Sequence, residues 1–248
     1  VTMMTVSRKI GLHPSTTYHL LRTLSGLGYL AQDGATKEYR FGSKVFHLAA
    51  SAQTEIQLLR AAAPVVVELA EQTGETAHLA VFERGEVIVI HKADGTSGIQ
   101  VSERVGYPRP AHSTAIGKLL LAHLTEPELK AFLGKHELAP ITPRTIVTVP
   151  ALEEELARVR AQGFAFDDEE FAQGIRCLAA PVRNFTGSVI AAIGVSGPVW
   201  RVPPDRVAEL AALVKIMGRR LSEELGAPAE PEGAGSAAPP AAEPPRPQ

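Results

Sequence analysis

The spacing of hydrophobic positions divides the chain into four regions. Residues 1–42 are short, basic and rich in turn signals, and residues 43–60 carry apolar side chains at helical period. Residues 61–226 alternate strand and helix patterns, whereas residues 227–248 are rich in proline, a composition typical of disordered tails. Pro64 is expected to break or restart the helix that begins at 43. The pattern therefore predicts a small domain, a linker helix, a larger domain and a disordered tail.

The larger domain combines strand and helix patterns. Strand patterns occur at 76–82, 87–91, 165–167, 176–182 and 188–196. Helical patterns occur at 115–124, 126–133, 152–162 and 204–225. Because the strands come in neighbouring runs rather than in strict β-α-β alternation, the simplest arrangement is a mainly antiparallel sheet with helices on one side. The fold class predicted is α+β.

The predicted linker helix has an apolar stripe without a core of its own. Its members are Phe46, Leu48, Ala49, Ala52, Ile56 and Leu59. A helix of this kind usually packs against a second copy of the same chain. The sequence therefore predicts a homo-oligomer, either a dimer or a dimer of dimers.

Composition narrows the possible functions. The whole chain carries a net charge of −2, yet residues 1–44 hold six basic and two acidic side chains, which suits a polyanionic partner. Cys177 is the only cysteine, and the eight histidines are scattered, so no disulfide, metal or cofactor is expected. The apolar runs are too short to cross a membrane and no leader pattern opens the chain, so a cytoplasmic location is expected.

The amino-terminal region reads as two helices, 5–11 and 14–24, followed by a ribbon around the turn Asp33-Gly34. One face of the second helix is apolar, with Thr17, Leu20, Leu21 and Leu24. The opposite face and the ribbon offer hydrogen-bond donors and cations suited to phosphates and base edges in a DNA major groove. The candidate DNA contacts are Ser15, Thr16, Tyr18, His19, Arg22, Lys37 and Arg40. A helical hairpin used only for packing is the alternative.

The run GLHPSTTYHLLRTL at 11–24 resembles the signature of IclR transcriptional regulators, whose pattern is G-L-x-x-S-T-x-x-R-L-L-x-T-L. His19 stands where that family usually has arginine, so a phosphate or guanine contact is expected to be weaker or differently aimed. The resemblance also implies a further helix that would precede Val1. Its absence would expose Leu12, Leu20 and Leu24, at about 1.5–3 kcal/mol for each fully uncovered side chain. The natural chain is therefore expected to extend upstream.

The resemblance continues through motifs such as Thr73-Gly74-Glu75-Thr76, the run AHSTAIGK at 111–118 and Gly174-Ile175-Arg176-Cys177. It implies a winged helix-turn-helix joined to a GAF-like domain that binds a small effector. The residues that match the family's pocket are Ala115, Ile116, Asp167, Cys177, Gly194 and Ser196. Without the resemblance, an acidic turn, a core cysteine and a strand-end serine would be the favoured explanations of Asp167, Cys177 and Ser196.

The chemistry of the ligand can be narrowed further. The loop at 112–114 leads into a helix, so free backbone amides there suit a carboxylate. The family often has serine at the place of Gly194, and the missing hydroxyl is expected to open space for a ligand bulkier or less polar than the smallest oxo-acids. A small organic acid is the predicted effector.

Two other functional classes are compatible with parts of the sequence. His112, Ser113, Asp167 and Ser196 are residue types found in hydrolases, but no G-x-S-x-G elbow is present, so no catalytic residue is assigned. A ligand-binding dimer without DNA function is the second alternative, because the amino-terminal module lacks its first helix. The sequence favours a DNA-binding regulator whose operator affinity depends on the bound acid.

Overall fold

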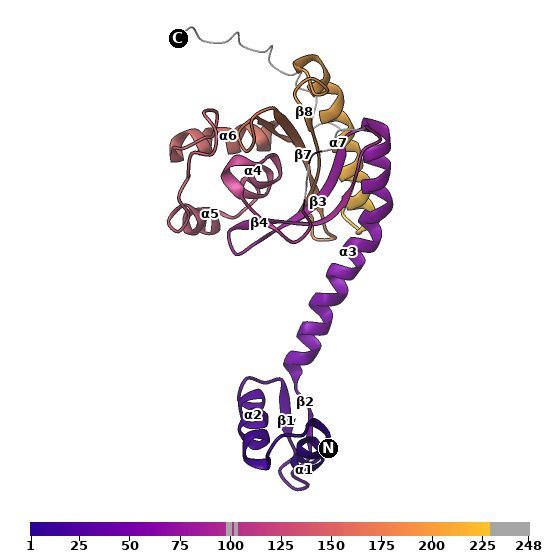
Figure 1. Cartoon of the computed structure of the whole chain (residues 1–248), viewed down its shortest axis with the longest axis vertical. Helices are drawn as coiled ribbons and strands as arrows, with labels where there is room; N and C mark the ends of the chain where they lie inside the picture. The colour runs from indigo at the N-terminus through magenta and orange to yellow at the C-terminus, as the bar shows by residue number, and fades with distance from the viewer. Residues whose placement is uncertain (98–100, 102–103, 229–248) are drawn as a thin grey trace. The chain divides into compact units, whose positions relative to one another are not determined.

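The computed structural model describes residues 1–97, 101 and 104–228, with the backbone alone for residues 46–56. The chain divides into two compact units, Val1–Leu58 and Leu59–Gln248 (Figure 1). Beyond Pro228, the predicted tail lies outside the described residues. The same holds for most side chains of the predicted linker stripe.

The small unit holds two helices and a two-stranded ribbon. These are α1 (Met3–Ile10), α2 (Pro14–Gly26), β1 (Leu30–Gln32) and β2 (Tyr39–Phe41). Helix α1 begins earlier than predicted because the Thr2 side chain accepts a hydrogen bond from the Thr5 amide, and it ends where Gly11 takes a φ of 70°. The ribbon strands are antiparallel, with Ala31 opposite Arg40, as the sequence predicts.

The apolar face of α2 is only partly covered. Thr17 and Leu21 are buried, at 1% and 6% exposure. Leu20 and Leu24 are exposed at 48% and 40%, and Leu12 in the turn at 40%. The predicted exposure of the three leucines is thus confirmed, and the small unit presents an open apolar strip.

A long helix, α3 (Ser43–Thr73), contains Pro64 in its interior. The predicted break at Pro64 is therefore wrong. Proline removes one helical hydrogen bond and crowds the preceding turn. Its neighbours Ala62, Val65 and Val66 are fully buried, at 0% exposure, and this burial offsets the loss.

The large unit is built on a six-stranded antiparallel sheet with the strand order β5-β4-β3-β8-β7-β6 (Figure 1). The strands are β3 (Thr76–Glu83), β4 (Glu86–Ala93), β5 (Pro108–Pro110), β6 (Ala165–Asp168), β7 (Ile175–Arg183) and β8 (Val189–Pro198). A hairpin joins β3 to β4, the strands that the patterns at 76–82 and 87–91 predict, with Arg84 and Gly85 at φ values of 54° and 91°. Strand β5 was not predicted, since three residues with two prolines carry no strand pattern.

Helices cover both faces of this sheet. Figure 1 shows α4 (Ala115–Ala122), α5 (Glu126–Leu133) and α6 (Val149–Gln162) on one side, with α3 and α7 (Pro204–Glu224) on the other. Two neighbouring residues of β7 face opposite ways. Ala179 belongs to the core beneath α4. Ala180 faces α7, where a Cβ placed on Gly218 would lie 3.4 Å from the Ala180 side chain. Successive strand residues point to opposite faces, so both faces of β7 are buried.

The predicted placement of helices on one side of the sheet is therefore wrong, while the α+β class and the antiparallel sheet are confirmed. The sequence signal for two-sided burial is the nearly continuous apolar run in β8, at 189–195. Among the described helices, none combines the length and apolar character that a bilayer span requires.

Candidate functional site

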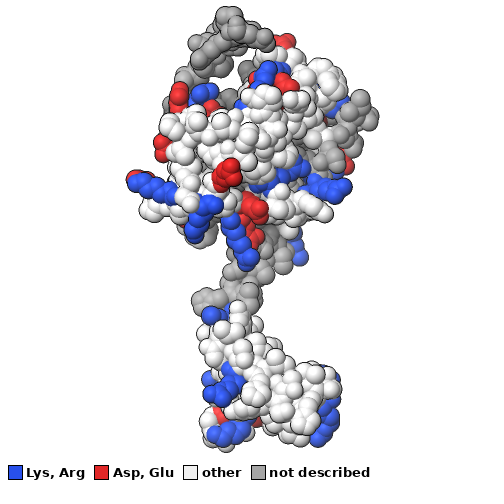
Figure 2. Space-filling model, turned by 60° about the vertical axis from the view of Figure 1, so that its left-hand side comes forward, with Lys and Arg blue, Asp and Glu red and all other residues white. Residues whose placement is uncertain are grey.

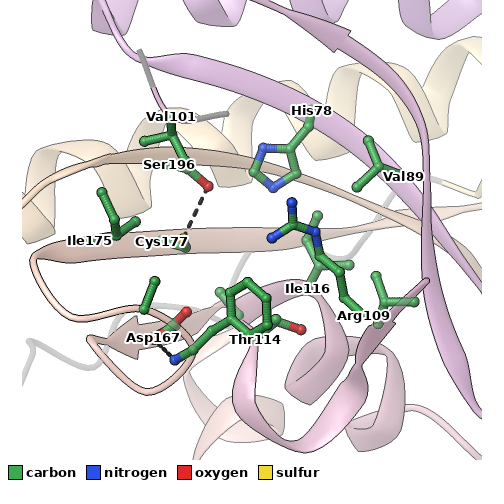
Figure 3. Close-up of a pocket in the computed structure, with 14 residues that line it drawn as sticks. His78, Val89, Val101, Arg109, Thr114, Ile116, Asp167, Ile175, Cys177 and Ser196 are labelled. Carbon is green, nitrogen blue, oxygen red and sulfur yellow. Dashed lines mark hydrogen bonds between the residues drawn. The ribbon is translucent and has the colours of Figure 1, made fainter. Parts of the chain in front are cut away.

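A cavity of about 140 Å³ lies between the start of α4 and the sheet face that α4 covers (Figure 3). Every strand of the sheet contributes at least one side chain to its wall. The lining residues are His78, Val87, Val89, Val101, Arg109, Thr114, Ala115, Ile116, Asp167, Phe171, Ala172, Ile175, Cys177 and Ser196. Five of the six effector-binding candidates are among them, namely Ala115, Ile116, Asp167, Cys177 and Ser196.

Asp167, Cys177 and Ser196 form a row across three neighbouring strands. Asp167 pairs with Cys177 and Cys177 with Ser196 in the register of the sheet. Residues directly opposite one another on antiparallel strands share a face, so all three side chains reach the cavity. The Cys177 Sγ lies 3.0 Å from the Ser196 Oγ (Figure 3). Strand pairing thus brings together three residues that lie far apart in the sequence.

Gly194 is not among the cavity-lining residues. It pairs with His78 across β3 and β8, and a Cβ placed on it would lie 3.3 Å from the His78 Nε2 and 2.5 Å from the Leu178 carbonyl oxygen. The open space expected beside Gly194 is therefore occupied by the His78 ring and by the neighbouring backbone. The preference for a bulkier ligand stays a prediction, but this glycine does not supply the room for it.

The Asp167 carboxyl is held in an almost fully buried position, at 2% exposure. Its Oδ1 accepts hydrogen bonds from the amides of Glu170 (2.7 Å) and Phe171 (3.4 Å). Burial, reinforced by the nearby Glu170 charge, raises the pKa of Asp167 to about 7. The carboxyl can therefore hold a proton near neutral pH and donate it in a hydrogen bond.

Next to Asp167 lies an ion network centred on Lys118, whose side chain is 1% exposed. Its Nζ contacts the Glu155 Oε1 at 3.1 Å, the Phe166 carbonyl oxygen at 2.5 Å and the Glu170 Oε1. Burial raises the pKa of Glu170, and the Lys118 charge opposes that rise. Lys118 thus anchors α4 to the segment that carries Asp167.

The first turn of α4 faces the cavity. The Thr114 Oγ1 accepts a hydrogen bond from the Gly117 amide at 3.1 Å. The amides of Ala115 and Ile116 have no helical acceptors, because they belong to the first turn. A Cβ on Gly117 would lie 2.2 Å from the Ala111 carbonyl oxygen, so glycine is needed for this close approach. An anion site at this helix start stays a prediction, and the amides of Ala115 and Ile116 are the groups it would use.

Arg109 is the most consequential residue that sequence reasoning missed. It stands on β5 opposite Val87, and its Cζ lies 4.9 Å from the centre of the Phe171 ring. In Figure 3 its guanidinium points into the cavity toward His78. A lone arginine between two prolines has no periodicity, but its position just before the predicted 112–114 anion loop was a usable signal.

The residues that suggested a hydrolase do not assemble. The His112 Nε2 lies 3.1 Å from the Ala139 carbonyl oxygen, and neither His112 nor Ser113 lines the cavity that holds Asp167 and Ser196. Within the described part of the chain, no group of three or more His, Cys, Asp or Glu side chains could hold a metal ion.

The candidate DNA contacts all lie on the surface of the small unit. Ser15, Thr16, Tyr18, His19, Arg22, Lys37 and Arg40 are exposed. The ribbon turn is fixed by the Asp33 Oδ1, which accepts hydrogen bonds from the amides of Ala35 (2.9 Å) and Thr36 (2.8 Å). In Figure 2 the visible face of this unit carries more blue than red. The exposed polar helix face and the basic ribbon are thus available to a polyanion.

Comparisons with known proteins place this architecture in a family. The IclR carboxy-terminal domain of bacterial transcriptional regulators matches residues 50–223, and the IclR helix-turn-helix domain matches residues 1–34. The HTH-type transcriptional regulator KdgR of Escherichia coli K12 is 37% identical over 221 residues, covering 89% of this chain and 84% of the relative. The transcriptional repressor IclR of the same organism is 35% identical over 216 residues, covering 86% and 79%.

Solved structures agree with these relatives. The Thermotoga maritima IclR superposes with a TM-score of 0.67 at 29% identity and covers 91% of each chain. The carboxy-terminal domain of Escherichia coli KdgR gives 0.63 at 36% identity, covering 68% of this chain and 99% of that one. The family's role is transcriptional regulation and not catalysis. The chain belongs to the IclR family of bacterial transcriptional regulators.

Proposed function

We propose that this chain is a DNA-binding transcriptional regulator whose affinity for an operator is changed by a small organic acid bound in the cavity of the large unit. The observation that carries the proposal is the pairing of two features in one chain. A helix with an exposed polar face and a basic ribbon occupy one unit, and a mainly apolar cavity with a few polar groups, at a helix amino terminus, occupies the other. The chromosome on which such a regulator acts lies in the cytoplasm.

The DNA-reading role is supported by the exposure of α2. Tyr18, His19 and Arg22 lie on the solvent side of a helix whose other face holds the buried Thr17 and Leu21. Such a helix can enter a major groove while the ribbon contacts the flanking backbone. His19 in place of arginine favours a shorter contact on that face.

The organic-acid effector is supported by the cavity's polar groups. The amides of Ala115 and Ile116 suit a carboxylate. Asp167, Cys177 and Ser196 offer hydrogen bonds on the sheet side. Apolar side chains such as Val87 and Ile175 complete the wall, so a small acid with a short carbon chain fits the lining.

A homo-oligomer is proposed because regulators of this type read two half-sites. Two helix-turn-helix modules bind one helical turn of DNA apart only if the chains are paired. Light scattering coupled to size-exclusion chromatography measures the state directly, and a monomer at micromolar concentration would contradict it.

The test of DNA binding is fluorescence anisotropy with a duplex from the region upstream of the chain's own gene. Specific binding should weaken steeply with salt, because phosphate contacts release counterions. Arg22→Ala should weaken it about tenfold. Lys130→Ala, on an exposed ion pair with Glu126 in the large unit, is the matched control and should leave it unchanged. Absence of salt-sensitive, sequence-specific binding would favour a ligand-binding dimer without DNA function.

A further inference from the structure

Arg109 brings a cation into the cavity. The amides at the start of α4 could hold an anion without it. Arginine stays protonated at all physiological pH values, and its planar fork can hold a carboxylate through two hydrogen bonds. The side chain packs its guanidinium over the Phe171 ring at 4.9 Å and points into the cavity (Figure 3). Pro108 and Pro110 on either side restrict the backbone that carries this side chain.

The cavity is electrically asymmetric. Arg109 lies on β5 and Asp167 on β6, which are the two edge strands of the sheet. The wall therefore contains both a permanent cation and a buried carboxyl. Among the described lining residues, Arg109 is the one that carries a permanent positive charge. An ionised acidic group of a ligand is therefore attracted to Arg109, whereas Asp167 offers it at most a hydrogen bond while it holds its proton.

Arg109 adds to the carboxylate site that is proposed at the start of α4. The amides of Ala115 and Ile116 at the start of α4 can hold one carboxylate without any side-chain charge. A single carboxylate can accept hydrogen bonds from these amides or from both arms of the guanidinium, but not from both groups at once. A ligand with two acidic groups can use both.

The size of the cavity limits the distance between two such groups. At about 140 Å³ it is close to the roughly 150 Å³ of a cavity that accommodates benzene. A ligand of about six to ten non-hydrogen atoms fills such a space. A carbon chain with an acidic group at each end falls within this range.

We propose that Arg109 is a specificity-determining residue that recognises a second acidic group of the ligand, so that short dicarboxylates bind more tightly than monocarboxylates of the same chain length. The proposal rests on the organic-acid function proposed above. It assigns the α4 amides to one carboxylate and the Arg109 guanidinium to the other.

The test compares matched acids by isothermal titration calorimetry of the full chain. The pairs are succinate with butyrate and glutarate with pentanoate. The wild-type protein should prefer the diacid of at least one pair by about tenfold or more, the size expected for a hydrogen bond to a charged group. Arg109→Gln should bring the two affinities of that pair within about threefold, while Arg109→Lys should keep part of the preference because it keeps the charge.

Two controls separate recognition from folding. Arg104→Gln removes an exposed cation that lies over Tyr107 at 5.4 Å, outside the cavity lining, and should leave the diacid preference unchanged. The melting temperature of each unliganded variant shows whether it is folded. A purely structural role for Arg109 would lower that temperature without changing the ratio of diacid to monoacid affinities.

The outcomes are distinct. Equal binding of diacid and monoacid by the wild type, or a preference that survives Arg109→Gln, would overturn the role of Arg109 but leave an organic-acid effector standing. No binding of any of the four acids would overturn both this inference and the proposed effector class.

Discussion

The two units of the chain differ most in how far they bury the apolar side chains of their helices. On α2 of the small unit, Leu20 and Leu24 are exposed at 48% and 40%. On α4 of the large unit, Leu119 and Leu121 are fully buried, and even the charged Lys118 is 1% exposed. The large unit therefore owes its stability to its own core. The small unit has few buried side chains, and its remaining apolar strip contributes little stability unless something covers it.

The largest effect should come from the buried charge of the large unit. Lys118→Met leaves Glu155 and Glu170 without their shared cation, and removing one partner of a buried ion pair costs about 3–5 kcal/mol. Urea unfolding followed by the fluorescence of Trp200, the only tryptophan, reports on this unit. Partial recovery of stability at acidic pH, where the glutamates become neutral, is expected as well. A loss below about 1 kcal/mol would show that the network is not a structural anchor.

A slightly smaller effect is expected at Leu119 on the same helix. Leu119→Ala creates a cavity in a fully buried position and should cost about 2–5 kcal/mol in the same unfolding experiment. If the cost were below about 1 kcal/mol, α4 would not be packed as tightly as its burial indicates.

The pH dependence of stability probes the cavity wall. The pKa of Asp167 is raised to about 7 from 3.8, so between these values the folded chain holds a proton that the unfolded chain has released. Stability should therefore fall as pH rises through this window. Asp167→Asn should remove a contribution to that fall on the order of 2 kcal/mol, measured by urea unfolding at pH 5 and pH 8. An unchanged pH profile would mean that Asp167 is ionised in the folded chain throughout.

The smallest effect is predicted for the exposed strip of the small unit. Leu20→Ala should change its stability by no more than about 0.5 kcal/mol, because the side chain is largely in water already. The change can be measured by comparing the melting of the full-length wild type and variant by far-ultraviolet circular dichroism. A cost of 2 kcal/mol or more would show that the strip is covered in solution, by a second copy or another segment.

Much of the fold was readable from local patterns. The β3–β4 hairpin follows from alternation around Arg84-Gly85, and the α2 start follows from Pro14 at its first position. Cys177 and Ser196 were assigned to the pocket through the family resemblance, and strand register explains why they meet. These features depend on residues close in sequence or on a shared pattern.

Other features depend on contacts between residues far apart in the sequence, which a local pattern cannot predict. Lys118 reads as an exposed residue of a helix, but its partners Glu155 and Glu170 lie on distant segments. Arg109 lies on a strand of three residues, too short to show a period. The continuation of α3 through Pro64 depends on tertiary burial that outweighs a local penalty.

The central claim is that a ligand in the large unit changes DNA binding by the small unit. The direct measurement is the Kd for the upstream duplex, determined by anisotropy at fixed salt with and without a saturating organic acid that calorimetry shows to bind. The account predicts at least a tenfold change in Kd for the wild type and a much smaller one for a cavity variant with impaired acid binding. An identical Kd with and without the bound acid would contradict it.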